Sequence, residues 1–200
     1  MSKKVLEHFK KNDLVMFELA LKVNDKSVFD LKKSDNFFLS LCREIIGQQL
    51  AGKAAHAIFN RFLNLFPKQE INKELILKIP EQILRDAGMA WAKVRALKDL
   101  ASKTKNGEVN LKKLEKMVDK EVITELTKIK GIGPWTAEMF LMFSLAREDV
   151  YSFKDLGLRK AIKRAYEIDD LTESKAEKIS LNWSPFKTYA CRILWKSLDR

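Results

Sequence analysis

The stretch LTKIKGIGPWTAEMFLMF, residues 126–143, sets two hydrophobic segments on either side of Lys130-Gly131-Ile132-Gly133-Pro134. Both segments repeat apolar residues at helical spacing, so they predict two helices joined by a tight turn with Ile132 between them. Glycines allow left-handed backbone angles and close approach of a ligand, and proline fits the first turn of a helix. That first turn attracts anions through its N–H groups and dipole. The stretch therefore predicts an anion-binding helical hairpin; the alternative is an ordinary helix–helix turn.

The composition indicates a folded chain with a polyanionic partner. Hydrophobic residues make up 46% of 200 residues, which is enough for one domain or for two small lobes. Lys and Arg number 38 against 27 Asp and Glu, a net charge of +11 that favours nucleic acid over an anionic membrane. The alternative is a lysine-rich proteome that raises the charge without a binding role.

The cysteines and the chain start point to an intracellular protein. Cys42 and Cys191 lie far apart in apolar surroundings and form no metal or cluster motif, which indicates buried thiols in a reducing compartment. The sequence has no signal-peptide core and no apolar run approaching eighteen residues. We expect the protein in the cytoplasm or nucleoid, or in the nucleus of a eukaryote.

Apolar residues recur at helical spacing along almost the whole chain, and no Asn-Gly or Asp-Gly turn joins two alternating β-branched runs. The sequence therefore predicts an all-α fold. Asp13, Ser34, Asn110 and Asp119 are the predicted caps. The predicted helices span about residues 13–22, 34–46, 51–66, 80–87, 91–105, 110–117, 119–128, 135–146, 156–166, 173–182 and 185–198.

The pattern Leu-x-x-Ile-x-Gly-Ile-Gly-Pro-Trp-Thr-Ala resembles the helix-hairpin-helix of DNA repair glycosylases. Four other segments match that superfamily in the right order: REIIGQQLAGKAAHAIFNRF, RDAGMAWAKVRALKDLA, DVYSFKDLGLRKAI and NWSPFKTYACRILW. The chain is similar to the HhH-GPD superfamily over residues 5–200, and within it to the AlkA-type 3-methyladenine DNA glycosylases II in their short form without an N-terminal β-domain. The resemblance implies a single glycosylase unit of two helical lobes flanking a DNA-binding cleft, with one lobe at about 35–145 and the other at 1–34 plus 146–200.

The resemblance places the catalytic carboxylate at Asp155. A carboxylate near the sugar stabilises an oxocarbenium-like transition state or activates the attacking water. The residue type alone equally predicts a helix N-cap, and the two roles are compatible. Ser152-Phe153-Lys154 departs from the family pattern, which often has proline there, so the shape of this loop is open.

A base must leave the duplex before its glycosidic bond can be cut, and the gap must be filled. By resemblance Gln49 is the wedge, with Gln48 and Leu50 beside it, and Ala51 begins the supporting helix. The alternative is that Gln48 and Gln49 only cap a bend at Gly47.

Alkylated purines are cationic, so aromatic rings can bind them by cation–π contact. Trp135 and Trp183 match aromatic pocket positions of the family, whereas Met139 and Leu156 stand where relatives often carry further rings. Phe186, Tyr151 and Trp91 are looser candidates. For each tryptophan the alternative is core packing, and Trp195 is assigned to the core.

The resemblance also assigns the hairpin and the type of reaction. Relatives that cut the strand use a lysine at the position of Trp135, so a monofunctional enzyme is expected. The predicted contacts to the DNA backbone are Lys130, Gly131, Ile132, Gly133 and Thr136. No cofactor is required; the family's hairpin often binds Na⁺ or K⁺ through carbonyls, here those of Thr127, Ile129 and Ile132.

The sequence thus predicts a monomeric glycosylase that acts on double-stranded DNA containing alkylated bases. Its substrates would be alkylated purines, above all 3-methyladenine, with 7-methylguanine and related bases. Two alternatives stay open: a non-catalytic protein that binds damaged DNA through the same fold, and a glycosylase for another lesion such as hypoxanthine or uracil.

Overall fold

The computed structural model describes residues 2–50 and 52–199, and within these ranges it contains helices, turns and loops but no strand. The predicted all-α fold is confirmed. The chain divides into two compact units, one made of Met1–Lys33 with Ala146–Arg200 (unit 1) and one of Ser34–Leu145 (unit 2). Each unit has its own core, so each is described by itself.

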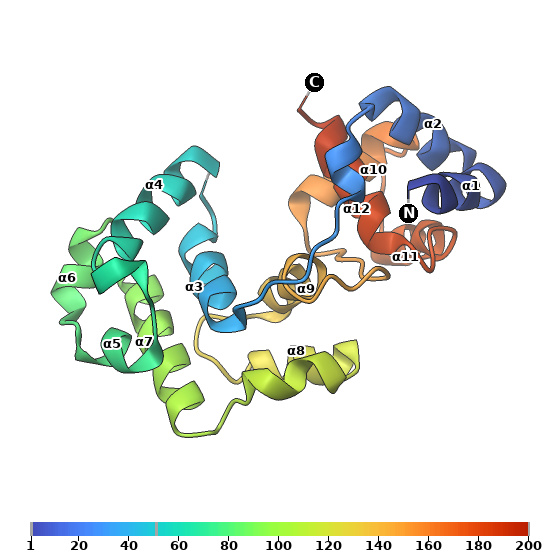
Figure 1. Cartoon of the computed structure of the whole chain (residues 1–200). Helices are drawn as coiled ribbons and strands as arrows, with labels where there is room; N and C mark the ends of the chain where they lie inside the picture. The colour runs from blue at the N-terminus through green and yellow to red at the C-terminus, as the bar shows by residue number, and fades with distance from the viewer. Residues whose placement is uncertain (1, 51, 200) are drawn as a thin grey trace. The chain divides into compact units, whose positions relative to one another are not determined.

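Unit 2 is built on α7, the helix that α3, α5 and α6 pack against, while α8 and α9 form the hairpin (Figure 1). The elements of unit 2 are α3 (Phe37–Gly47), α4 (Gly52–Leu63), the 3-10 helix η2 (Pro67–Gln69), α5 (Lys73–Lys78), α6 (Glu81–Asp86), α7 (Trp91–Lys105), the 3-10 helix η3 (Leu111–Lys116), α8 (Asp119–Leu126) and α9 (Pro134–Phe143). Ile45, Phe62, Leu97 and Phe140 are among its fully or almost fully buried side chains.

Unit 1 is built around α12, which packs against α2 and α10 (Figure 1). Its elements are α1 (Ser2–Asn12), α2 (Leu14–Val23), the 3-10 helix η1 (Lys26–Phe29), α10 (Leu156–Ala165), α11 (Glu173–Leu181) and α12 (Lys187–Ser197). Residues from both ends of the chain therefore share one core, in which Phe9, Met16, Tyr189 and Leu194 are fully buried.

Short polar side chains start several helices by accepting N–H bonds that the first turn leaves open. Asp13 caps α2 and Asn110 caps η3, as predicted. The predicted cap Ser34 is wrong, because Asn36 accepts the bond from Leu39 N at 3.0 Å and Ser34 precedes the helix. Asp119 is not a cap either; it is the first residue of α8, and Glu121 accepts a bond from Val118 N.

The helix boundaries differ from the prediction in a few places. α1 and α5 were not predicted. The helix expected over 51–66 starts at Gly52 among the described residues, since Ala51 lies outside them, and it ends at Leu63, before Pro67 opens η2. α9 stops at Phe143 with Ser144 as its C-cap, and Ala146, where φ is 54°, lies outside the helix that was expected to include it.

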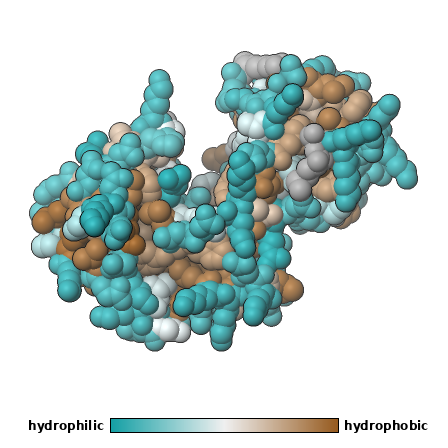
Figure 2. Space-filling view, in the orientation of Figure 1, coloured by the Kyte–Doolittle hydropathy of each residue, from teal (hydrophilic) through white to brown (hydrophobic). Residues whose placement is uncertain are grey.

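Hydrophilic side chains cover most of the face shown in Figure 2, and hydrophobic residues appear between them in smaller areas on both units. In the part of the chain that the structure describes, every helix falls short of the length and hydropathy that crossing a bilayer requires.

Candidate active site

The turn of the hairpin between α8 and α9 is closed from inside by two isoleucines. Ile129 and Ile132 are buried, and Ile132 N donates to Ile129 O at 3.1 Å. Gly131 has φ 82°, and a Cβ there would lie 3.0 Å from the Cβ of Ala96 on α7. Left-handed angles were expected at both glycines, which is wrong for Gly133: its φ is −95°, and a Cβ there would meet no atom within 4 Å. Gly131 is thus required by packing, whereas Gly133 leaves an open approach to the start of α9.

A carboxylate on α7 fixes the outer side of this turn. Asp99 Oδ2 accepts the N–H of Lys130 at 2.6 Å and the ammonium of Lys103 at 3.0 Å. Partial burial acts to raise the pKa of Asp99, but the Lys130 N–H and the Lys103 ammonium outweigh it and hold that pKa below its usual value. Lys103 Nζ also donates to Lys128 O at 2.5 Å. The backbone of Lys130 is therefore held in place while its side chain stays exposed.

The turn between α3 and α4 is braced against the hairpin by Gln48. Its Nε2 donates to Gly131 O and to Thr136 Oγ1, both at 3.0 Å. Thr136 is only 3% exposed and its side chain serves this brace, so its predicted contact with the DNA backbone, which stays a prediction, would use its backbone N–H. The amide of Gln48 is occupied inside unit 2, so this residue has a structural role, and its place beside the wedge stays a prediction.

The wedge position itself lies on the surface. Gln49 is exposed and has φ 57°, and Leu50 beside it is half-buried. Lys93 of α7 holds this turn from below, since its Nζ donates to Ile46 O and Gln48 O at 2.9 Å each. Burial lowers the pKa of Lys93. Gln49 is thus exposed on a supported turn, and its role as the wedge stays a prediction.

Trp135 and Met139 occupy one face of α9, one turn apart, directly after the hairpin turn. Trp135 is half-buried, and Met139 is 5% exposed. Of the two predicted pocket residues of unit 2, Trp135 therefore has an aromatic ring with exposed surface, whereas Met139 lies in the core.

In unit 1 the predicted carboxylate is both a helix cap and a fixed, oriented group. Asp155 Oδ1 accepts the N–H of Leu158 at 2.8 Å and the indole N–H of Trp195 at 2.9 Å. The side chain is 9% exposed. The predicted helix cap is confirmed, and the cap bond also orients the carboxylate, while the catalytic role of Asp155 stays a prediction.

Trp195 was assigned to the core, and the structure corrects that assignment. Its ring is half-buried and donates to Asp155 from α12, forty positions along the chain. Gly157 makes room for the pair: a Cβ there would lie 3.1 Å from Asp155 Oδ1 and 3.2 Å from Trp195 Cδ1. In the sequence, Gly157 two positions after Asp155 indicates that another side chain packs closely there, but it does not identify Trp195 as that side chain.

The loop before Asp155 is held by α12 without the proline that relatives often have. The fully buried Thr188 donates from Oγ1 to Arg147 O at 2.6 Å and accepts the N–H of Val150 at 3.1 Å. Farther along, the guanidinium of Arg159 lies over the ring of Phe153, 5.0 Å from its centroid. These contacts give the Ser152-Phe153-Lys154 segment a defined path into α10.

The other pocket residues predicted in unit 1 do not form one surface. Trp183 is 0% exposed, and its Nε1 donates to Asp13 Oδ2 at 3.0 Å and to the Tyr166 hydroxyl oxygen at 3.1 Å. A ring without exposed surface has no face to offer a base, so Trp183 is a core residue and its assignment to the pocket is corrected. Phe186 is buried as well, with its ring edge-to-face against His8, whereas Leu156 is 75% exposed on the first turn of α10.

The donor chemistry of the hairpin turn fits a monovalent cation, because backbone carbonyl oxygens are hard ligands. Ile129 O accepts one N–H, from Ile132, and retains a second lone pair. Thr127 and Ile132 would supply the other carbonyls. Within residues 2–50 and 52–199, no group of three His, Cys, Asp or Glu side chains is arranged to hold a metal ion.

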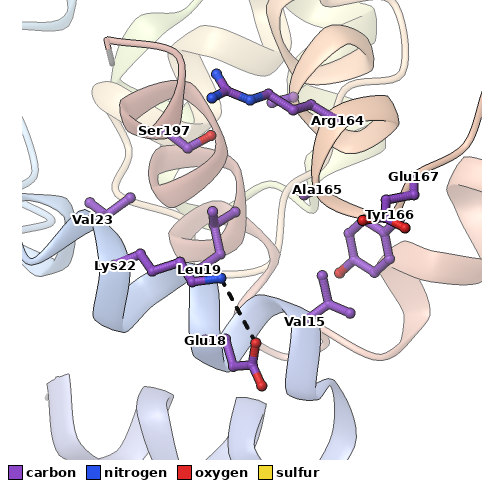
Figure 3. A pocket seen from close by; sticks show the side chains of 11 residues that line it. Val15, Glu18, Leu19, Lys22, Val23, Arg164, Ala165, Tyr166, Glu167 and Ser197 are labelled. Carbon is purple, nitrogen blue, oxygen red and sulfur yellow. Dashed lines mark ion pairs between the residues drawn. The ribbon is translucent and has the colours of Figure 1, made fainter.

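A concavity of about 570 Å³ lies elsewhere in unit 1, between α2, α10 and the end of α12. Figure 3 shows Arg164 and Tyr166 on one wall and the Glu18–Lys22 ion pair on the other. None of the residues predicted for the site lines it, so it carries no part of the expected chemistry.

Comparison with known proteins gives consistent matches. A family model described as HhH-GPD superfamily base excision DNA repair protein matches residues 42–186. The DNA-3-methyladenine glycosylase 1 of Schizosaccharomyces pombe is 38% identical over 160 residues, which are 78% of this chain and 70% of that protein. The structure of a 3-methyladenine DNA glycosylase from the same yeast, in complex with abasic DNA, has a TM-score of 0.85 at 31% identity, covering 96% of this chain and 95% of that chain. A DNA-3-methyladenine glycosidase from Bacillus halodurans has a TM-score of 0.79 at 33% identity, covering 96% of this chain and 88% of that chain.

The matched segment contains the wedge turn, the hairpin and Asp155 with its loop. The similarity to solved structures extends over nearly the whole chain and therefore includes both units. The family resemblance found in the sequence is confirmed. The chain belongs to the HhH-GPD superfamily of base excision DNA repair proteins.

Proposed function

We propose that this protein is a monofunctional DNA glycosylase that hydrolyses the N-glycosidic bond of alkylated purines in base excision repair. Its substrates are 3-methyladenine above all, with 7-methylguanine and related bases. The observation that carries the proposal is the carboxylate of Asp155, held by the Leu158 N–H and the Trp195 indole in a chain of this family. The names of its relatives in fission yeast and in Bacillus halodurans support the same substrate class.

The carboxylate acts on the sugar. As the glycosidic bond breaks, positive charge develops on the deoxyribose, and a fixed anion nearby stabilises it or orients the attacking water. Two N–H donors to Oδ1 hold Asp155 with little freedom to rotate, so little reorganisation is needed during the reaction. The base departs readily, because alkylation has already made it cationic.

The residues of unit 2 bind and open the DNA. The N–H groups in the first turn of α9 and the side chain of Lys130 contact phosphates, and the bare backbone at Gly133 lets the strand approach. Gln49 fills the gap that the everted nucleotide leaves. Trp135 binds the cationic base with a cation–π contact of roughly 0.5 to 2 kcal/mol.

The product is an abasic site in an unbroken strand. Strand cleavage through a Schiff base needs an amine at the position of Trp135, and an indole has none to offer. The protein acts as a monomer on double-stranded DNA, which light scattering with and without a duplex would test.

The deciding experiment treats randomly methylated DNA with the protein and identifies the released base by mass analysis. We expect 3-methyladenine from the wild type and a loss of at least a hundredfold in Asp155→Asn, which keeps the size of the side chain but removes its charge. Asp170→Asn, on the surface of the same unit, is the matched control and should keep full activity.

Three results would contradict the proposal. Undiminished release by Asp155→Asn would remove that residue from the chemistry. Tight binding to methylated or abasic DNA without release of any base would make the protein a damage-binding factor, and release of only uracil or hypoxanthine from a lesion panel would change the substrate.

A further inference from the structure

One face of α10 is basic from Arg159 to Arg164. Its exposed side chains recur at helical spacing and are Leu156, Arg159, Lys160, Lys163 and Arg164. The opposite face is buried in unit 1 through Leu158, Ala161 and Ile162. The four cations, Arg159, Lys160, Lys163 and Arg164, are called the α10 basic face below. They line a shallow groove of about 540 Å³ with Leu156, Ile168 and Asp169.

This charge is not neutralised within the protein. Residues 154–164 include five basic side chains and one acidic side chain, Asp155, which is engaged at the start of the helix. None of the four cations forms an ion pair with any residue in the described part of the chain. Asp169 is the acidic residue that lines the groove with them.

The arrangement is unfavourable for an isolated helix. Arg159 with Lys163, and Lys160 with Arg164, are like charges four residues apart, and each such pair destabilises a helix by a few tenths of a kcal/mol. The helix dipole favours cations only in the last turn, so it compensates for Lys163 and Arg164 but not for the other two. A row of anions lying along the groove would relieve the repulsion of all four.

We propose that the α10 basic face is a second surface for the DNA backbone, in unit 1 and distinct from the hairpin of unit 2. The inference rests on the proposed function, because Asp155 caps the same helix and acts on a nucleotide of the bound strand. At a rise of about 1.5 Å per residue the four cations extend from roughly 6 to 14 Å beyond Asp155 along the helix. The phosphates of one strand follow each other at about 3.4 Å along the duplex axis, so two or three of them come within reach of these side chains.

The test measures affinity for an undamaged duplex between 50 and 200 mM salt. The variant Lys163→Gln/Arg164→Gln removes two charges from the last turn of α10, and the matched control Lys10→Gln/Lys11→Gln removes two from the last turn of α1 in the same unit. Each lost phosphate contact lowers the slope of log K against log salt by about 0.9. For the α10 variant we expect the slope of log K against log salt to be smaller than that of the wild type by about 1.8. Between 50 and 200 mM salt this variant would therefore lose about tenfold less affinity than the wild type loses. The control variant should keep the slope of the wild type.

An equal decrease of the salt slope in both variants would overturn the proposal, since only the net charge of the protein would then matter. An unchanged slope for the α10 variant would overturn it as well. If that variant does not fold by circular dichroism, Arg159→Gln/Lys160→Gln decides by the same criterion. A second arm of the experiment measures binding to vesicles of phosphatidylcholine with phosphatidylserine. If the α10 variant lost binding to these vesicles but bound DNA as the wild type does, the proposal would also be overturned. Because the duplex carries no lesion, failure to release a methylated purine contradicts the proposed function alone, and failure of this test contradicts the α10 surface alone.

Discussion

At the scale of single residues, the site combines what sequence can identify with what it cannot. Asp155 could be predicted as a site residue because a motif and a helix start coincide there. Thr188 and Trp195 could not, because buried or aromatic residues at helical spacing resemble core residues. The bond between Trp195 and Asp155 joins residues forty positions apart, a distance that no local pattern reports. Trp183, in contrast, matched the motif and is fully buried.

The Trp195 donor can be tested without emptying its position. Trp195→Phe keeps an aromatic ring and removes the N–H that reaches Asp155 Oδ1. A hydrogen bond to a charged group contributes about 1.5 to 3 kcal/mol, so we expect the single-turnover rate of base release to fall by roughly ten- to a hundredfold. Trp183→Phe is the control: it should lower the melting temperature through the lost bonds to Asp13 and Tyr166 but keep the rate. Equal single-turnover rates of base release in the two variants would contradict the role of Trp195 as a donor that positions Asp155.

Gly157→Ala should separate stability from activity. The added methyl group would lie 3.1 Å from Asp155 Oδ1 and 3.2 Å from Trp195 Cδ1, so one of the two must move. Alanine is favoured over glycine inside a helix by up to about 1 kcal/mol, which offsets part of the crowding. We expect a melting temperature within a few degrees of the wild type and a rate at least tenfold lower. In a Trp195→Phe background, Gly157→Ala should lower the rate of base release much less, because the bond between Trp195 and Asp155 is already absent. Additive losses of rate would mean that Gly157→Ala does not act through this bond.

Glu44 gives the protein a pH-dependent stability. Burial raises the pKa of this carboxyl from 4.5 to about 7, against a smaller opposing effect of Arg43. A group whose pKa is higher in the folded chain takes up protons on folding, so the free energy of unfolding falls as the pH rises from 4.5 to about 7. Glu44→Gln should therefore be about 1 to 3 kcal/mol more stable than the wild type at pH 8 and equal to it near pH 4. Denaturant unfolding at both pH values would show it, and a constant difference would count against this account.

At the scale of elements, most helices were predictable because their capping and breaking signals are local. α7 runs from Trp91 to Lys105 as predicted, between an extended Ala90 and a turn at Gly107. α5 has only six residues and too few apolar positions to show a period, and α1 follows no start signal, so both were missed. The brace from the α3–α4 turn to the hairpin also escaped prediction, because Gln48 and Gln49 look alike in sequence.

These two glutamines should behave in opposite ways. Gln48→Leu leaves Gly131 O and the buried Thr136 hydroxyl without their donor, which should cost about 1 to 3 kcal/mol of stability. Gln49→Ala removes an exposed side chain and should leave the melting temperature unchanged while slowing base eversion. Thermal melting and the fluorescence of 2-aminopurine beside the lesion would separate the two effects. Normal base eversion by the Gln49→Ala variant would contradict the role of Gln49 as the wedge.

At the scale of the whole molecule, the chain enters unit 2 once and leaves it once. Ser34 N donates to Ser144 O at 2.9 Å, so the two ends of unit 2 lie side by side. We expect the fragment 34–145 to fold alone, because its core and its closing bond are internal. Its circular dichroism should show helix and a cooperative melt. A fragment without a thermal transition would mean that unit 2 depends on unit 1.

The paired ends at Ser34 and Ser144 have an evolutionary consequence. A segment that begins and finishes at the same point can be exchanged between homologous genes by two nearby crossovers, without rerouting the polypeptide that surrounds it. In the proposed mechanism unit 2 binds the DNA backbone and unit 1 carries Asp155, so these two functions could then diverge at separate rates. Chimaeras that carry the 34–145 segment of a relative would therefore test whether lesion preference can change while Asp155 and its partners stay the same.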